Sequence, residues 1–181
     1  MKKIILIAIL ICTFGFGVSA QKIAYVNTDY ILDNIPEYAD AQAQLDELSI
    51  QWQKEIEAKF AEIDKMYKNF QNEAVLLPED MKKKREDDII KKEKEGKDLQ
   101  KKRFGKEGDL FKKRQELIKP IQEKVYNAIE EIASAENYAV VFDKASNATL
   151  IYTNPKFDIS EQILDKLGYT YKAQPTTKGK K

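Results

Sequence analysis

Two long stretches without proline constrain the fold of this chain more than any other feature. Residues 37–77 contain neither proline nor glycine, and residues 79–119 contain no proline. Each stretch has 41 residues, which corresponds to about 60 Å of α-helix at a rise of 1.5 Å per residue. Only Pro78 separates them, so the sequence predicts two long helices that meet at a tight tip near residues 76–78.

The first stretch carries a regular stripe of apolar residues. Its members recur every 3.6 residues on average, which is the period of an α-helix: Ala41, Leu45, Leu48, Trp52, Ile56, Phe60, Ile63, Tyr67, Phe70, Ala74 and Leu77. Successive steps of four around Ile56 depart from a strict heptad, so we expect a nearly straight helix. Pro78 followed by Glu79 and Asp80 is typical of a new helix N-terminus. Residues 39–118 therefore predict an antiparallel helical hairpin, an arm.

The return leg of this arm is strongly charged and poor in apolar residues. Residues 82–109 contain 12 Lys and Arg against 8 Asp and Glu, a local charge of +4. Gly96, Gly105 and Gly108 fall in the same stretch, and each costs a helix interior about 1 kcal/mol relative to alanine. They are either hinges or tolerated defects of a thin leg. Pro120 predicts a kink or a helix restart near the point where the arm leaves the body.

Residues 21–38 and 119–171 predict a small β-rich body with a terminal helix, followed by a disordered tail at 172–181. Runs of β-forming residues predict three strands, at 22–26, 138–142 and 149–152, the last two joined as a hairpin. The fold class is therefore α+β and mostly α, with the long helical hairpin projecting from this body.

A body of three short strands leaves sheet edges to be covered, and oligomerisation is the simplest way to cover them. The strand side chains that we expect in its core, within one chain or shared between chains, are Ile23, Tyr25, Val26, Val140, Phe142 and Ile151.

The first twenty residues have the pattern of a cleaved export signal. Lys2 and Lys3 precede an apolar run at 4–11 that is too short to span a bilayer, and small residues lead up to Ala20. Cleavage there removes Cys12, the only cysteine, and leaves 29 basic and 30 acidic residues. We expect the mature chain, residues 21–181, to be exported and free of a membrane anchor.

The composition argues for binding or architecture rather than catalysis. The chain has no histidine, and its one cysteine lies in the expected signal. These absences exclude a histidine general base, a Ser-His-Asp or Cys-His pair and a His or Cys zinc site. Carboxylate chemistry stays formally open, but we expect no enzyme and no cofactor. Export and near-zero net charge make nucleic acid an unexpected partner.

The elements follow one another in a recognisable order. The strand at 22–26 precedes residues 30–38 and the charged hairpin, after which come 138–142, 151–152 and 158–160 before the terminal helix. This order resembles the Skp/OmpH family of periplasmic chaperones over residues 21–171. The resemblance rests on order and spacing together, because no single motif is highly specific.

The resemblance implies a jellyfish-shaped homotrimer with a β-rich body and three arms. Between its arms it would hold unfolded outer-membrane β-barrel proteins, as an ATP-independent periplasmic holdase. The charge pattern itself favours a solvated face for the return-leg lysines, with weak contact to membrane lipid phosphates or to acidic client segments as the alternative. The best-known members are strongly basic, whereas this chain is nearly neutral. Any electrostatic attraction of clients must therefore be local and should weaken with salt.

Two questions stay open at the level of sequence. Four aromatic residues of the first leg could line a client-binding cavity, but their helical spacing favours packing of the hairpin: Trp52, Phe60, Tyr67 and Phe70. The alternative function is a structural or adaptor coiled coil of the cell envelope. That function predicts longer uninterrupted heptads and no β-body.

Overall fold

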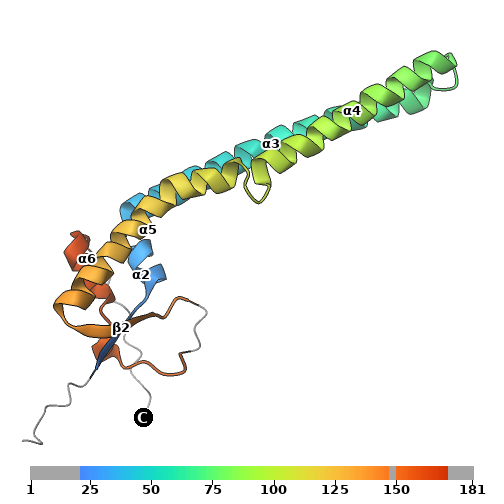
Figure 1. The fold of residues 1–181 in the computed structure, drawn as a ribbon. Coiled ribbons are helices and arrows are strands. Elements are labelled where there is room, and N and C mark those ends of the chain that lie inside the picture. The colour runs from blue at the N-terminus through green and yellow to red at the C-terminus, as the bar shows by residue number, and fades with distance from the viewer. Residues whose placement is uncertain (1–20, 147–149, 171–181) are drawn as a thin grey trace, which may run out of the picture.

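A computed structural model describes residues 21–146 and 150–170, and its dominant feature is a long arm that projects from a small body (Figure 1). One leg of the arm is helix α3, Pro36–Glu73, and the other consists of α4, Glu79–Phe104, and α5, Asp109–Ala135. The body contains β1, Lys22–Val26; β2, Tyr138–Asp143; α2, Thr28–Asp33; the 3-10 turn η1, Pro155–Phe157; and α6, Ser160–Leu167. The predicted α+β class is confirmed. The expected signal at 1–20 and tail at 172–181 lie outside the described residues.

The packing of the arm weakens from the body toward the tip. Helix α3 buries one face of the predicted stripe, at Ala41, Leu45, Ile56 and Ile63. In the return leg, α5 buries Ile118, Ile121, Val125 and Ala128, whereas α4, which is of nearly equal length, buries only Ile89 and Gly96. The distal half of the arm is therefore a thin pair of helices with most of its surface in solvent.

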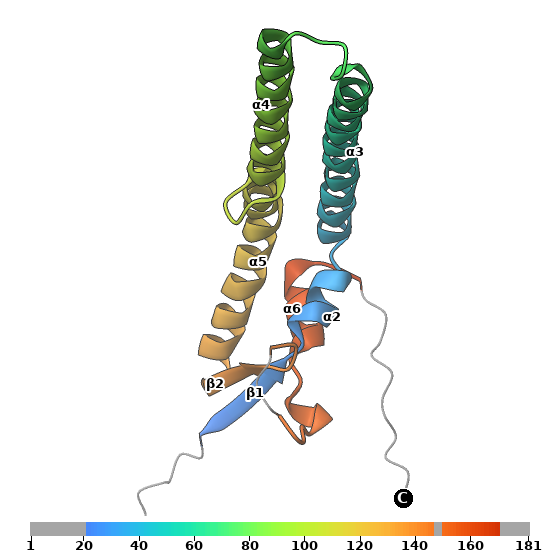
Figure 2. The same cartoon turned by 90° about the vertical axis from the view of Figure 1, so that its right-hand side faces the viewer.

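The return leg is broken between Phe104 and Asp109, where the sequence offered Gly105 and Gly108 as hinges or tolerated defects but placed the helix restart at Pro120. We expected one long helix with a kink or restart at Pro120, but α5 continues through Pro120, so the restart is wrong. The helix instead stops between Phe104 and Asp109, where a short loop bulges from the leg (Figure 2). A Cβ on Gly105 would lie 2.3 Å from the Lys101 carbonyl oxygen, so only glycine fits this tight turn.

The continuation of α5 through proline has a physical reason. Proline inside a helix costs about 3 kcal/mol, because it removes a backbone donor and crowds the preceding turn. Pro120 lies on the exposed side of α5, where water can reach the backbone carbonyl of Glu116 that proline leaves without a donor. Its neighbours Ile118 and Ile121 lie in the buried core, and this burial offsets the cost.

The sheet of the body is parallel, not the antiparallel hairpin that we predicted. β1 pairs with β2, with Ile23 opposite Val140 and Tyr25 opposite Phe142. Residues 150–154 form no strand, and Thr149 lies outside the described residues. The parallel pairing needs a long crossover between the strands, and the whole arm supplies it. β-forming residues at 150–152 do not suffice, because β propensity depends on a sheet edge and a face to pack against.

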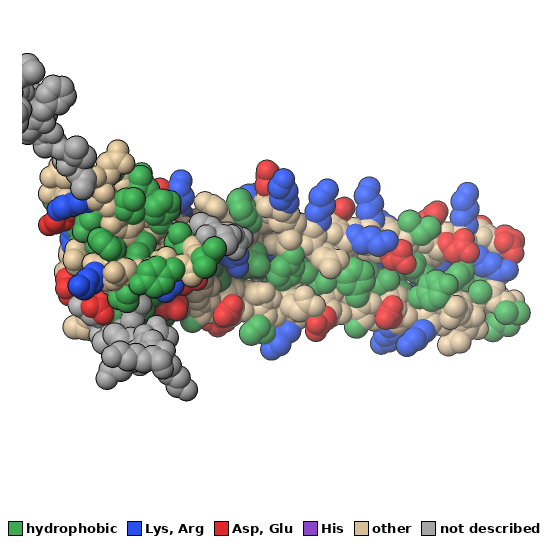
Figure 3. All heavy atoms as spheres, turned by 90° about the horizontal axis from the view of Figure 1, so that it is seen from below, with side chains coloured by type: hydrophobic (Ala, Val, Ile, Leu, Met, Phe, Trp, Pro, Cys, Tyr) green, Lys and Arg blue, Asp and Glu red, His purple; other side chains and the backbone are tan. Residues whose placement is uncertain are grey.

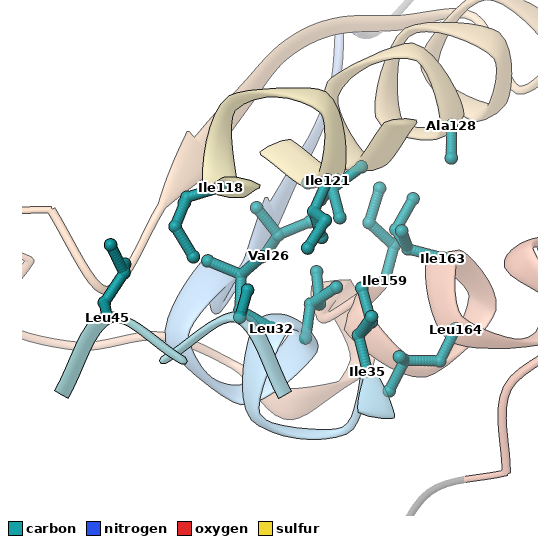
Figure 4. Close-up of a cluster of buried hydrophobic side chains, with 14 residues drawn as sticks. Val26, Leu32, Ile35, Leu45, Ile118, Ile121, Ala128, Ile159, Ile163 and Leu164 are labelled. Atoms are coloured by element: carbon teal, nitrogen blue, oxygen red, sulfur yellow. The ribbon is translucent and has the colours of Figure 1, made fainter. Parts of the chain in front are cut away.

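The core of the body joins α2 and α6 to the base of the arm (Figure 4). Ile159, Ile163 and Leu164 are buried against residues of β1, α2 and α5. Polar contacts fix the start of α2. The backbone N–H of Asn27 donates to Ser160 Oγ at 2.8 Å, and Thr28 Oγ1 donates to Asp143 Oδ2 at 2.7 Å. Gly168, at φ 80°, ends α6 in the left-handed conformation.

We predict that Ile163→Ala destabilises the protein by about 2–5 kcal/mol, because the side chain is 0% exposed and its removal leaves a cavity. Urea unfolding followed by circular dichroism measures this change. The matched control is Ile90→Ala on the exposed side of α4, for which we expect a change within about 0.5 kcal/mol. Equal effects of the two substitutions would contradict the described core.

Candidate functional site

The arm exposes large apolar side chains along its whole length. Two helices can bury only the faces that they turn toward each other, so any apolar residue outside that seam meets water. Figure 3 shows apolar side chains along one face of the arm, with basic and acidic side chains along its edges. Within the arm, residues 39–118, the exposed large apolar residues are Ile50, Tyr67, Val75, Leu76, Met81, Ile90 and Phe111. We call this set the arm surface.

The four aromatic residues singled out in the sequence do not share one environment. Tyr67 is exposed and belongs to the arm surface, whereas Trp52, Phe60 and Phe70 are half-buried. Trp52 packs edge-on against Phe104 of α4, with ring centroids 6.4 Å apart. Three of the four therefore contribute to the contact between the legs, and their contact with a client stays a prediction.

Gly96 is a close-packing position inside α4. A Cβ at this position would lie 3.3 Å from both Phe60 Cζ and Ile63 Cδ1 of α3. The missing side chain thus lets the two legs approach each other where α4 offers few apolar residues. Whether Gly96 also acts as a hinge stays a prediction.

Sequence reasoning missed most of the arm surface. Ile50, Ile90 and Phe111 were not among the predicted site residues, because a 3.6-residue stripe predicts only the packed face of a helix. A signal was present, since Ile50 departs from the 3.6-residue spacing of that stripe. An apolar residue off the packed face of an amphipathic helix is the pattern that could have identified it.

The return-leg lysines are partly engaged in ion pairs. Lys59 of α3 and Lys92 of α4 both lie 3.4 Å from Glu95 Oε2, which links the two legs. Partial desolvation raises the pKa of the Glu95 carboxyl, but the charge of Lys92 and the contact with Lys59 outweigh it and lower this pKa. The surface of the leg is therefore a mixture of paired and solvated charges, not an unbroken basic stripe.

The body carries a second exposed apolar surface. An open hollow of about 590 Å³ lies beside β1 and is lined mainly by Ile23, Tyr25, Phe142, Leu150, Tyr152 and Phe157. Ile151 and Tyr152 are 95% and 81% exposed. We call the exposed residues of this lining, which are all of them except Tyr25, together with Val140 and Ile151, the body face.

The six predicted body residues divide into two groups. Tyr25 and Val26 are buried within the chain itself, whereas Ile23, Val140, Phe142 and Ile151 are exposed on the body face. A two-stranded sheet is marginal on its own. This face and the sheet edges are the obvious places for further packing.

Among the described residues, no cluster of three or more acidic, histidine or cysteine side chains could hold a metal ion. The part of the chain that the structure describes also contains no helix that is long and apolar enough to cross a membrane.

Comparison with known proteins identifies the family. A family model described as outer membrane protein (OmpH-like) matches residues 22–167, and the chain belongs to this family. Its fold is similar to the crystal structure of a candidate outer membrane chaperone (OmpH-like) from Caulobacter crescentus CB15, with a TM-score of 0.64 and 14% sequence identity. The alignment covers 83% of this chain and 86% of the other. A search of curated proteins found no match.

We predict that Gly96→Leu loosens the arm, because its side chain has no room against Phe60 and Ile63. Overpacking of this kind costs about 1–3 kcal/mol. Hydrogen exchange of backbone amides in the distal arm should become about tenfold faster, which corresponds to about 1.4 kcal/mol.

The control for this prediction is Lys97→Leu, which adds the same side chain on the next, exposed position of α4. Exchange in this variant should match that of the unmodified chain. Slow exchange in Gly96→Leu would show that the legs do not meet as closely as described.

Proposed function

We propose that this protein is an ATP-independent holdase chaperone of the periplasm, which keeps unfolded outer-membrane proteins from aggregating. It would act as a homotrimer and hold its clients between three arms. Membership of the OmpH-like family supports this proposal, as does the fold it shares with an OmpH-like structure. It is a binding function rather than an enzymatic one.

The observation that carries the proposal is the spacing of apolar side chains over the arm surface. They stand singly or in small groups among charged residues of the sequence, from Phe111 in the first turn of α5 to Leu76 at the tip. Scattered apolar groups avoid the large patch that would make the chaperone itself aggregate. Several weak contacts on one extended client still add up, because each contact raises the effective concentration of the next.

The mechanism follows from the chemistry of these contacts. An unfolded β-barrel strand exposes alternate apolar side chains, and burial of apolar area yields about 25 cal/mol per Å² whatever the sequence. Such contacts need no defined pocket, so many clients can bind. They also need no nucleotide, because release requires only that the client fold or insert elsewhere. Salt should weaken only the part that arises from local charges on α4.

The body face supports self-association. It places Phe142, Ile151 and Tyr152 in solvent beside a sheet of only two strands. Burial of this face against further copies would complete the body and point several arms away from one hub. The number three, like the client class, comes from the resemblance to the family. The coiled-coil adaptor is less well supported, because the return leg is interrupted and a strand-containing body is present.

Three further assignments belong to the same proposal. The segment at 1–20 would direct export to the periplasm and be removed. The glycines of the α4–α5 loop, Gly105 and Gly108, would let the arm adapt to clients of different size. Lysines of the return leg would make weak contact with membrane lipids.

We predict that the triple variant Ile50→Ser/Ile90→Ser/Phe111→Ser binds clients about tenfold more weakly, a loss of about 1.4 kcal/mol. The measurement is light scattering of a urea-denatured outer-membrane barrel diluted into increasing concentrations of mature protein. The matched control replaces three exposed uncharged residues of the same legs, Gln51→Ser/Gln100→Ser/Gln115→Ser, and should act like the unmodified protein. A mature protein that leaves aggregation unchanged would refute the holdase proposal.

We predict that Ile151→Asp/Tyr152→Asp dissociates the oligomer, because each lost interface anchor costs about 2 kcal/mol and a charge is buried in its place. Multi-angle light scattering of the mature protein reports the mass. Both side chains are almost fully exposed in the single chain, so its own fold should survive. The control Tyr67→Asp/Ile90→Asp makes the same changes on the arm and should leave the mass unaltered. A monomeric unmodified protein would overturn the trimer.

A further inference from the structure

Only one of the two legs of the arm is interrupted. Helix α3 runs without a break from Pro36 to Glu73, past the level at which the return leg stops at Phe104 and resumes at Asp109 (Figures 1 and 2). Two helices joined at both ends can bend together only if one of them changes its length. The loop 105–108 is the one place in the described legs where α4 and α5 can move apart or together.

One side chain connects all three helices at this break. Arg103 lies in the last turn of α4, and its Nη1 donates to Asp109 Oδ2 in the first turn of α5 at 2.7 Å. Its Nη2 donates to Glu55 Oε2 of α3 at 3.1 Å, and its Nε donates to the same oxygen at 3.3 Å. Arg103 therefore ties the two ends of the broken leg to each other and to the unbroken one.

The aromatic residues beneath Arg103 fix its orientation. Its guanidinium carbon lies 4.9 Å from the centre of the Trp52 ring, and Trp52 in turn packs against Phe104. A planar guanidinium can stack on an indole and still use its edges for carboxylates, which an ammonium group cannot do. Trp52, Arg103 and Phe104 thus form a single packed unit across the two legs.

This contact differs from the other ion pairs of the arm. The Arg103 side chain is only 22% exposed, less than either partner in the Lys59–Glu95 or Lys97–Glu93 pair. Water and salt therefore screen it less. Its hydrogen bond to Asp109 and its contact with Glu55 raise the pKa of Arg103, so the group stays charged. Arg103 lies in the last turn of α4 and Asp109 in the first turn of α5, so each charge is also stabilised by the dipole of its own helix.

We propose that Arg103, stacked on Trp52 and paired with Glu55 and Asp109, is a clamp that holds the arm in its described shape. When these contacts break, α3 can bend and carry the distal part of the hairpin with it. The loop 105–108 then absorbs the change in length of the return leg. The clamp would regulate how far the arms open around a client, and this use of it rests on the proposed function. The bending itself does not.

The experiment measures the distance across the break in the mature chain, which has no native cysteine. Spin labels are placed on Lys94→Cys of α4 and Gln115→Cys of α5, and the labelled chain is diluted with unlabelled chain. Pulsed electron paramagnetic resonance then reports the distance between the two labels. In Arg103→Met we expect the ratio of open to clamped arms to rise about tenfold, which corresponds to about 1.4 kcal/mol. High salt should shift the unmodified arm in the same direction.

Two controls separate the clamp from general loosening. Arg114→Met removes the same charge from an exposed position on α5 and should leave the distance unchanged. A label pair within α4, Lys83→Cys and Gln100→Cys, should give one narrow distance in every variant. An unchanged distance across the break in Arg103→Met overturns the clamp. If that variant does not fold, an unmodified distance that is insensitive to salt overturns it instead.

Aggregation assays on the same samples separate this inference from the proposed function. Client protection with an unchanged distance in Arg103→Met would refute the clamp and leave the holdase standing. A broadened distance in Arg103→Met, together with an unmodified protein that gives no client protection, would support the clamp and refute the holdase.

Discussion

The parallel pairing of β1 with β2 is the contact on which the rest of the structure depends. It brings Lys22–Val26 beside Tyr138–Asp143. Most of the chain between these two strands forms the arm, so their pairing holds the two ends of the arm together at its base. Helices α2 and α6 then cover one side of the closed base with a buried core that includes Ile31 and Ile163. Because this core lies at one end, the arm draws little stability from the body beyond its first turns.

An arm of two helices exposes what a three-helix bundle would bury. Near the body, α5 matches α3 with buried side chains such as Val125, but farther out α4 offers only Ile89 and a glycine. The remaining apolar residues face water because the chain provides nothing to cover them. The same shortage that makes the distal arm thin makes its surface available for binding, so weak packing and the proposed function have one cause.

The sequence revealed the helices better than their interruptions. A period of 3.6 residues and the absence of proline are local properties, and they predicted both legs and the reversal between them. The break could not be placed, because propensity alone ranks Pro120 above Gly105 as a breaker. Helix α5 continues through Pro120 because Ile118 and Ile121 are buried in the core, and this burial is not visible in local propensity. Strand pairing failed for the same reason: Leu150 and Tyr152 are good β-formers, but a strand forms only where an edge receives it. The exposed residue Ile50 could have been found as an exception to the stripe.

The crossover position of the arm has a consequence for how such a protein can vary. Since both strands lie at the base of the arm, the packing of the body core does not depend on the number of helical turns in the two legs. Removing about 11 residues, close to three whole turns, from each leg would shorten the reach by about 16 Å and keep every apolar residue on its original side. Under the proposed function, arm length would set the space available between the arms, and selection could tune it to the size of the client without changing the body.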